Sequence, residues 1–225
     1  NIFPTLISKI CEKYKVHQFI HLSALGIEGA KGSNYAKSKL EGEKNIKKNF
    51  SKTTILRPSV VYSVDDNFTT KFMTLLNLLP IFPLYYNGNT KFTPIHCSDL
   101  TEVIYQVILK NINSTTIECL GPEVISLKNL LKRLLRIMEK KRLLLPMPLI
   151  LAKLSAIIFQ LLPKPILTLD QLNLLKYDNI ASKKYKNNFD LGIPSVHVFD
   201  LEIEKYAFMW KEAGEFSKKN KIKNK

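Results

Sequence analysis

Hydrophobic residues in the first sixty positions change from a helical period to a strand period and back. Residues 5–14 place their apolar side chains three and four positions apart, which predicts an amphipathic helix. Residues 16–22 form a β-rich run, which predicts a buried strand that opens into a loop at Ser23. Residues 34–50 return to the helical pattern, and residues 53–57 predict a second strand.

This order of strand, helix and strand is a βαβ unit, which implies a parallel sheet with helices on its faces. The rest of the chain alternates between the same two patterns. It is predicted to contain a helix at 69–79, a short strand or hairpin within 80–94, a helix capped by Ser98-Asp99, a strand at 115–120, and a helix at 127–140 capped by Ser126.

A proline-rich apolar run spans residues 143–165. Its core, residues 149–162, contains Lys153 and is shorter than the roughly 20 apolar residues that a membrane span needs. Two interpretations stay open: a helix buried in the protein or lining a groove, and an interfacial helix lying on a membrane. The buried helix is favoured, because a polar face of Lys153, Ser155 and Gln160 is thin for a surface binder.

Composition places the chain among globular proteins and argues against several classes. It has 225 residues, 45% of them hydrophobic and 24% charged. Its three cysteines lack C-x-x-C spacing and its four histidines lie far apart, so we expect no disulfide framework, no metal site and a reducing compartment. The net charge of +15 comes almost entirely from lysine, which disfavours nucleic-acid binding. The chain does not begin with Met, and we expect residues to precede it.

Tyr35 and Lys39 form a Tyr-x-x-x-Lys pair on the helix predicted between the two strands. Positions four apart share a helix face, so the phenol and the ammonium can point into one cleft. A nearby cation lowers the pKa of a tyrosine toward the range of a general acid/base. Ser23, at the end of the preceding strand, can hydrogen-bond a substrate oxygen. These groups suit hydride transfer between a carbonyl and an alcohol, although the pair alone also fits a surface helix with a half-buried tyrosine.

Several segments carry a resemblance to a known family. They are His17-Gln-Phe-Ile-His-Leu-Ser23-Ala-Leu-Gly26, Tyr35-x-x-x-Lys39-x-x-Gly42-Glu43, Leu56-Arg57-Pro58-Ser59-Val-Val-Tyr62, and Phe92-Thr-Pro94-Ile-His96-Cys-Ser98-Asp99-Leu100. The chain resembles an atypical short-chain dehydrogenase/reductase of the NAD-dependent epimerase/dehydratase type. On Leu145-Pro146-Met-Pro148, Asp170-Gln171 and Asp178-Asn179, it is similar more specifically to bacterial relatives of the NAD(P)H-binding accessory subunit of respiratory complex I.

The resemblance implies an α/β fold, the C-terminal portion of a Rossmann-like doubly wound parallel sheet with a small, mostly helical C-terminal subdomain. Residues 1–120 would form a truncated NAD(P)-binding domain with an insert around 63–97. Residues 121–212 would form a substrate or partner subdomain, and residues 213–225 a basic tail.

The resemblance also implies roles for single residues. Tyr35 would be the acid/base and would bond the nicotinamide ribose, Lys39 would hold the ribose hydroxyls and lower the Tyr35 pKa, and Ser23 would polarise the substrate oxygen. The cofactor, NADP(H) or NAD(H), would lie along Pro58, Ser59, Val60 and Val61. Asp99 matches a structural position of the family and is left out of the site.

The chain departs from the family at the phosphate-binding turn. Family members begin with a strand, a G-x-x-G-x-x-G turn and a helix whose N-terminus binds the pyrophosphate. Gly26, Gly29 and Gly32 have this spacing, but they lie between the serine strand and the tyrosine helix, so we interpret them as loop glycines. We expect about 90 residues of the dinucleotide-binding half to be missing, and cofactor affinity of this chain to be low.

Three hypotheses about function follow. The first is an accessory or assembly factor of respiratory NADH:quinone oxidoreductase (complex I) with little or no turnover, which contacts complex I subunits and is cytoplasmic or peripheral on the cytoplasmic face of the inner membrane. The second is an active NAD(P)-dependent oxidoreductase, epimerase or dehydratase on a nucleotide-sugar-like substrate. The third is an inactive split-gene fragment. The first is favoured over the second because residues 80–97 and 143–165, the expected pocket walls, are mostly apolar.

Overall fold

The centre of the fold is a parallel sheet with the strand order β1-β2-β7-β10. Its strands are β1 (Phe19–Leu22), β2 (Thr53–Pro58), β7 (Thr115–Cys119) and β10 (Lys186–Asn187). The computed structural model describes residues 2–161, 165 and 167–216 of the chain. The parallel pairing of β1 with β2 confirms the predicted βαβ unit.

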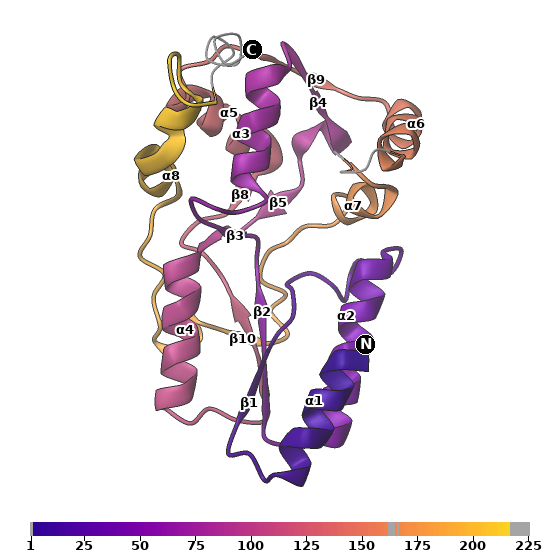
Figure 1. Cartoon of the computed structure of the whole chain (residues 1–225), viewed down its shortest axis with the longest axis vertical. Coiled ribbons are helices and arrows are strands. Elements are labelled where there is room, and N and C mark those ends of the chain that lie inside the picture. Colours follow the sequence, from indigo (N-terminus) through magenta and orange to yellow (C-terminus); the bar gives the residue numbers. More distant parts are fainter. Residues whose placement is uncertain (1, 162–164, 166, 217–225) are drawn as a thin grey trace.

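Helices cover both faces of this sheet (Figure 1). Helices α1 (Ile2–Lys13) and α2 (Asn34–Asn49) lie on one side, and α4 (Cys97–Leu109) lies on the other. Side chains alternate along a strand, so Arg57 of β2 faces α2 while Leu56 packs with Val103 of α4. The α/β architecture with a Rossmann-like sheet is as predicted.

A second group of elements lies above the sheet in Figure 1. It comprises α3 (Thr69–Leu78), β4 (Ile81–Leu84), a 3-10 helix (Tyr85–Gly88), β5 (Lys91–Phe92), β8 (Ile125–Ser126), α5 (Leu127–Ile137), β9 (Leu143–Pro146), α6 (Leu149–Gln160), α7 (Leu169–Leu174) and α8 (Phe199–Ala207). Helices α3, α5 and α8 share one apolar core that includes Met73, Leu134 and Phe199. The short pair β3 (Val61–Tyr62) and β6 (Ile95–His96) connects this group to the sheet.

Of the two alternatives for residues 80–94, the structure has short strands and not a hairpin, because β4 pairs with β9 and β5 pairs with β8. One cap differs from its prediction. The N-cap of α4 is His96 instead of Ser98-Asp99, since the His96 Nδ1 accepts the backbone N–H of Ser98 at 3.3 Å. The Ser126 cap of α5 is confirmed.

Helix α6 is buried along a narrow face only. Ala152 and Ala156 pack against the protein, while a row of larger apolar side chains is exposed: Leu149, Ile150, Leu151, Leu154, Ile157, Ile158, and Leu161 just beyond the helix. The buried-helix interpretation is therefore wrong for most of its surface. Residues 162–164 of the predicted apolar run lie outside the described residues. Within the described part of the chain, no helix has the length and apolarity needed to cross a membrane.

Arg57 is a buried cation that joins four parts of the chain. Its Nε and Nη2 donate to the Glu43 carboxylate at 2.9 and 2.6 Å, and its Nη1 donates to Glu28 at 3.0 Å. Arg57 and Glu43 are each 4% exposed. The guanidinium also lies 4.7 Å from the centre of the Tyr185 ring, and the Tyr185 hydroxyl donates to Glu28. Burial opposes the charge of Glu28, but hydrogen bonds from Lys184, Tyr185 and Arg57 outweigh it and lower the Glu28 pKa to about 2.

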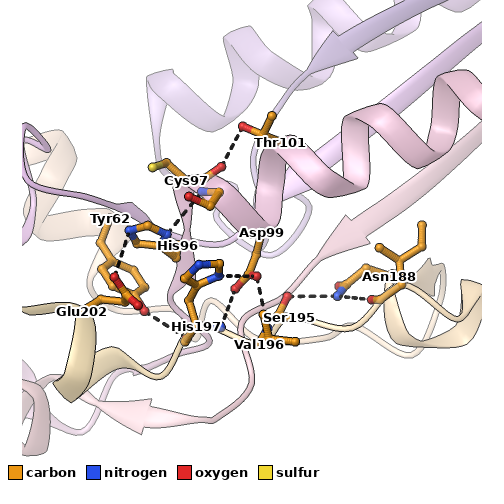
Figure 2. Close-up of polar contacts among 12 residues, drawn as sticks. Tyr62, His96, Cys97, Asp99, Thr101, Asn188, Ser195, Val196, His197 and Glu202 are labelled. Atoms are coloured by element: carbon orange, nitrogen blue, oxygen red, sulfur yellow. Dashed lines mark hydrogen bonds and ion pairs between the residues drawn. The ribbon is translucent and has the colours of Figure 1, made fainter.

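Asp99, in the first turn of α4, holds the segment that leads into α8 (Figure 2). Its carboxylate accepts the backbone N–H groups of Val196 and His197 at 3.1 and 3.2 Å, and it bonds the His197 ring at 2.7 Å. This matches the structural role expected for Asp99. The His197 ring stacks on His96 with 4.7 Å between centroids, and Nε2 of His96 lies 3.9 Å from Glu202. Burial and then the neighbouring His197 lower the pKa of His96.

We expect the Glu43→Gln variant to lower the free energy of unfolding by about 3 kcal/mol, because it leaves a buried guanidinium short of one carboxylate. Glu28 keeps the loss at the lower end of the range for broken buried pairs. The matched control is Glu123→Gln, which breaks a half-exposed pair with Arg133 and should cost less than about 1 kcal/mol. Urea unfolding of the three proteins measures both, and equal losses would contradict the central role of Arg57.

A second prediction concerns acid stability. His96 binds a proton more readily in the unfolded chain than in the folded protein, because its folded-state pKa lies below the ordinary value of 6.5. The stability that neutral His96 contributes is therefore complete above that value and is lost as the pH falls below it. Between about pH 7.5 and about pH 5.5 the native protein should lose more unfolding free energy than His96→Gln. Parallel urea titrations at the two pH values would contradict this if both proteins lost the same amount.

Candidate functional site

A cavity of about 830 Å³ lies where the sheet meets the upper group of elements, and most of the predicted site residues line it. Those residues are Ser23, Tyr35, Pro58, Ser59, Val60 and Val61. The volume is within the range of small-molecule sites. Lys39 lies beside Tyr35 but is not part of the cavity wall.

Ser23 follows β1 directly, lines the cavity and carries a buried hydroxyl. The residue is 6% exposed, and its Oγ has no hydrogen-bond partner among the residues that the structure describes. Its backbone N–H continues the strand pairing by donating to the Leu56 carbonyl at 2.7 Å. A buried hydroxyl without a partner costs about 1–3 kcal/mol. The Ser23 Oγ is therefore suited to bond an oxygen of a ligand in the cavity.

Tyr35 and Lys39 lie on one face of α2, as their spacing predicts. The Lys39 Nζ is 5.9 Å from the centre of the Tyr35 ring, and it donates to the Leu22 carbonyl of β1 at 3.3 Å. Burial raises the pKa of the Tyr35 phenol. The structure thus brings the two groups together, and the roles expected of them stay predictions.

Asp170 of α7 fixes the start of α2 and with it the position of Tyr35. One carboxylate oxygen accepts the backbone N–H of Asn34 at 2.8 Å, and the other accepts the Ser33 hydroxyl and the Tyr35 N–H at 3.0 and 3.1 Å. Ser33 in turn caps the helix by accepting the Ala36 N–H. Sequence reasoning missed this function of Asp170, because 135 residues separate it from Tyr35 and no local pattern connects them.

Asp178 and Asn179 hold the opposite side of the cavity. The Asn179 side chain donates to the Leu25 carbonyl at 2.8 Å and accepts the Ser59 hydroxyl at 2.6 Å. Asp178 accepts the backbone N–H of Lys91 at 2.8 Å. The hydroxyl of Ser59, a predicted cofactor residue, is therefore bonded within the protein.

The glycine-rich loop lies between β1 and α2, as predicted. Gly26 has a φ of +76°, and a Cβ there would come within 3.1 Å of the Asp178 carbonyl oxygen, so this position requires glycine. The helix that follows does not present a free N-terminus, since the Asp170 carboxylate already accepts its first N–H groups. A carboxylate in this place would repel a phosphate. The N-terminus of α2 is therefore not suited to bind a pyrophosphate.

Beyond Ser23 and Tyr35 the cavity wall is mostly apolar. Its side chains come from α3, the neighbouring short strands and the segment before α6, and include Phe68, Phe72, Leu75, Phe82, Phe92 and Met147. Lys71 and Asp178 are the charged residues among the described residues that line it. Of the lining residues from 80–97 and 143–165, Phe82, Pro83, Phe92 and Met147 are apolar as predicted, whereas Tyr85 and Ser155 carry hydroxyl groups.

No family model matches the chain. It is 26% identical over 190 residues to the mitochondrial 40 kDa subunit of NADH-ubiquinone oxidoreductase from Neurospora crassa, which covers 83% of this chain and 49% of that protein. It is 23% identical over 192 residues to mouse NADH dehydrogenase 1 alpha subcomplex subunit 9, covering 84% of this chain and 51% of that protein. The chain thus spans about half the length of these relatives.

Several solved structures with the same fold are named as enzymes of nucleotide sugars. The UDP-glucuronic acid 4-epimerase of Bacillus cereus, in complex with UDP-glucuronic acid and NAD, superposes with a TM-score of 0.62 at 18% identity, covering 92% of this chain and 66% of that one. The dTDP-4-dehydrorhamnose reductase of Clostridium acetobutylicum gives 0.62 at 16% identity, covering 90% and 69%. These similarities establish the fold. The chain therefore has the fold of these epimerases and reductases, and it is similar in sequence to the 40 kDa and alpha subcomplex subunit 9 proteins of NADH-ubiquinone oxidoreductase.

Proposed function

We propose that this chain is an NAD(P)-binding accessory or assembly protein of a respiratory NADH:quinone oxidoreductase, with little or no turnover of its own. The observation that supports this most strongly is the sequence similarity to the 40 kDa subunit, which spans 83% of the chain.

The cofactor part of the proposal rests on the nicotinamide side of the site. The Tyr35 hydroxyl and the Lys39 ammonium would hold the ribose hydroxyls, and Pro58, Val60 and Val61 would cover the nicotinamide with apolar groups. Bound NAD(H) or NADP(H) would supply hydride transfer. Asp170 is a positioning residue in this arrangement, since it holds the first turn of α2.

A second candidate function is an active oxidoreductase or epimerase on a nucleotide-sugar-like substrate. One observation favours it: the Ser23 hydroxyl is buried, unpaired among the described residues and in the same cavity as Tyr35. The apolar wall opposes it, because a sugar needs several polar partners. Turnover of a sugar nucleotide that is abolished by Tyr35→Phe would favour this candidate over the first.

We further propose that the exposed face of α6 is where the chain meets its partner, the membrane-bound part of the complex. The face carries Ile150, Leu154 and Ile158, and an exposed apolar patch of this kind is typical of an interaction site. The net charge of +15 would favour the anionic cytoplasmic face of an inner membrane. We therefore propose that the protein is cytoplasmic and peripheral to that membrane.

Cofactor binding is tested by calorimetric titration with reduced nicotinamide mononucleotide (NMNH) and with NADPH. We expect the two ligands to bind with similar, weak affinities, because the chain offers contacts to the nicotinamide half alone. Lys39→Met should weaken both about tenfold, the effect of losing a charged hydrogen-bond donor. Lys37→Met, on an exposed position of the same helix, is the control and should leave binding unchanged. Indifference to Lys39→Met, or no binding of either ligand, would contradict the cofactor proposal.

The partner proposal is tested in cells whose native chain is replaced by variants. The double variant Ile150→Lys/Ile158→Lys should lower the amount of assembled complex on native gels, because it places two charges on the α6 face. Ile108→Lys/Leu109→Lys on α4 is the matched control, since those side chains are similarly exposed and lie at the other end of the molecule (Figure 1). Tyr35→Phe should leave assembly intact. Normal assembly with the α6 variant would show that this face is not the contact.

A further inference from the structure

We propose that the apolar part of the cavity binds a fatty acyl chain whose anionic headgroup pairs with Lys71. We call this part the acyl compartment, and its walls are Phe68, Phe72, Leu75, Phe82, Phe92 and Met147. The inference goes beyond the proposed function, because neither the compartment nor Lys71 takes part in holding a cofactor.

The aromatic side chains of the acyl compartment form one connected wall. Phe68 contacts Phe72 and Phe92, with ring centroids 5.1 and 5.6 Å apart, and Phe72 contacts Phe82 at 6.0 Å. The three chain segments that supply them are packed by the core of α3 and α5, so the wall is preformed. Each methylene group that a ligand buries here contributes about 0.8 kcal/mol, which favours a long hydrocarbon chain.

Most polar side chains around the cavity are already bonded to the protein. The Ser59 hydroxyl bonds Asn179, the Ser155 hydroxyl bonds the Ala152 carbonyl, and the Gln171 side chain accepts the Thr168 N–H. The hydroxyls of a bound sugar would have few partners left, and each unmet group costs about 1–3 kcal/mol. An acyl chain carries no such groups. Its requirement for polar contact is limited to one end.

Lys71 supplies that contact. It lies on α3 next to Phe68 and Phe72, and its Nζ donates to the Pro165 carbonyl at 3.3 Å. It forms no ion pair within the described part of the chain, and the other charged lining residue, Asp178, is tied to the Lys91 backbone. A cation without a counterion at an apolar wall is complementary to a carboxylate or a phosphate on a hydrocarbon chain.

Helix α6 connects the acyl compartment to an apolar exterior. Met147, just before the helix, and Ser155 within it line the cavity, whereas Leu151, Leu154 and Ile158 are exposed. The same element thus separates the cavity from a surface that suits contact with lipid. A lipid-derived ligand would reach the cavity at this helix.

The binding test uses cis-parinaric acid, a fatty acid whose fluorescence rises in an apolar site. We expect the protein to enhance its fluorescence, and palmitate to displace it. Palmitate and lysophosphatidylglycerol as competitors distinguish a free fatty acid from a phospholipid as the source of the chain, and displacement by either supports the proposal. No enhancement, or displacement by UDP-glucuronic acid, would overturn it.

Two variants assign the site. Lys71→Met should weaken palmitate binding about tenfold while leaving uncharged 1-hexadecanol unaffected, because the charge alone is removed. Leu78→Glu places a carboxylate in the cavity wall at a position that is 41% exposed, and should abolish binding of both ligands. Leu109→Glu on α4, outside the cavity, is its control. Equal palmitate affinity in Lys71→Met and native protein would contradict the headgroup assignment whatever the folding of Leu78→Glu.

The two variants test the acyl-site proposal and the cofactor proposal independently of each other. Lys39→Met should weaken NMNH binding and leave palmitate binding unchanged, and Lys71→Met should do the reverse. Loss of both ligands in both variants would show a general structural effect and would overturn the acyl assignment.

Discussion

A single buried guanidinium constrains the arrangement of this protein. Arg57 lies next to the last residue of β2 and is 4% exposed, and a buried cation is costly unless carboxylates pair with it. Glu43 from α2 and Glu28 from the loop after β1 meet that requirement, and Tyr185 closes the far side. The next residue along β2 is Pro58, which lines the cavity. The ion pairs of Arg57 therefore also fix the position of this part of the cavity wall.

The C-terminal part of the chain completes the site from a distance. Asp170 accepts the first N–H groups of the helix that carries Tyr35, and Asn179 connects Leu25 to Ser59. Asp170 thereby occupies a helix N-terminus, which is the kind of place where phosphates bind in related architectures. The Asp170 carboxylate thus holds Tyr35 in place, and at the same time it prevents an anion from binding at the start of α2.

The fold of this protein does not by itself indicate which ligand its cavity binds. The fold is shared with enzymes that are named for nucleotide sugars, yet the cavity wall beyond Ser23 and Tyr35 is mostly apolar. A scaffold of this kind supports many functions because the walls vary while the sheet does not. The proposed acyl ligand and the proposed partner contact rest on these walls and on the exposed apolar face of α6.

Local periodicity was sufficient to predict the βαβ unit, the shared face of Tyr35 and Lys39, and Ser23 at a strand end, because backbone geometry repeats every few residues. Contacts over long separations were not predictable in this way. The Asp170 cap, the raised pKa of Tyr35 and the exposure of α6 depend on which distant segments pack together and how much water they exclude. The sequence by itself determined the elements and the candidate residues, and the tertiary structure decided their partners and their charge.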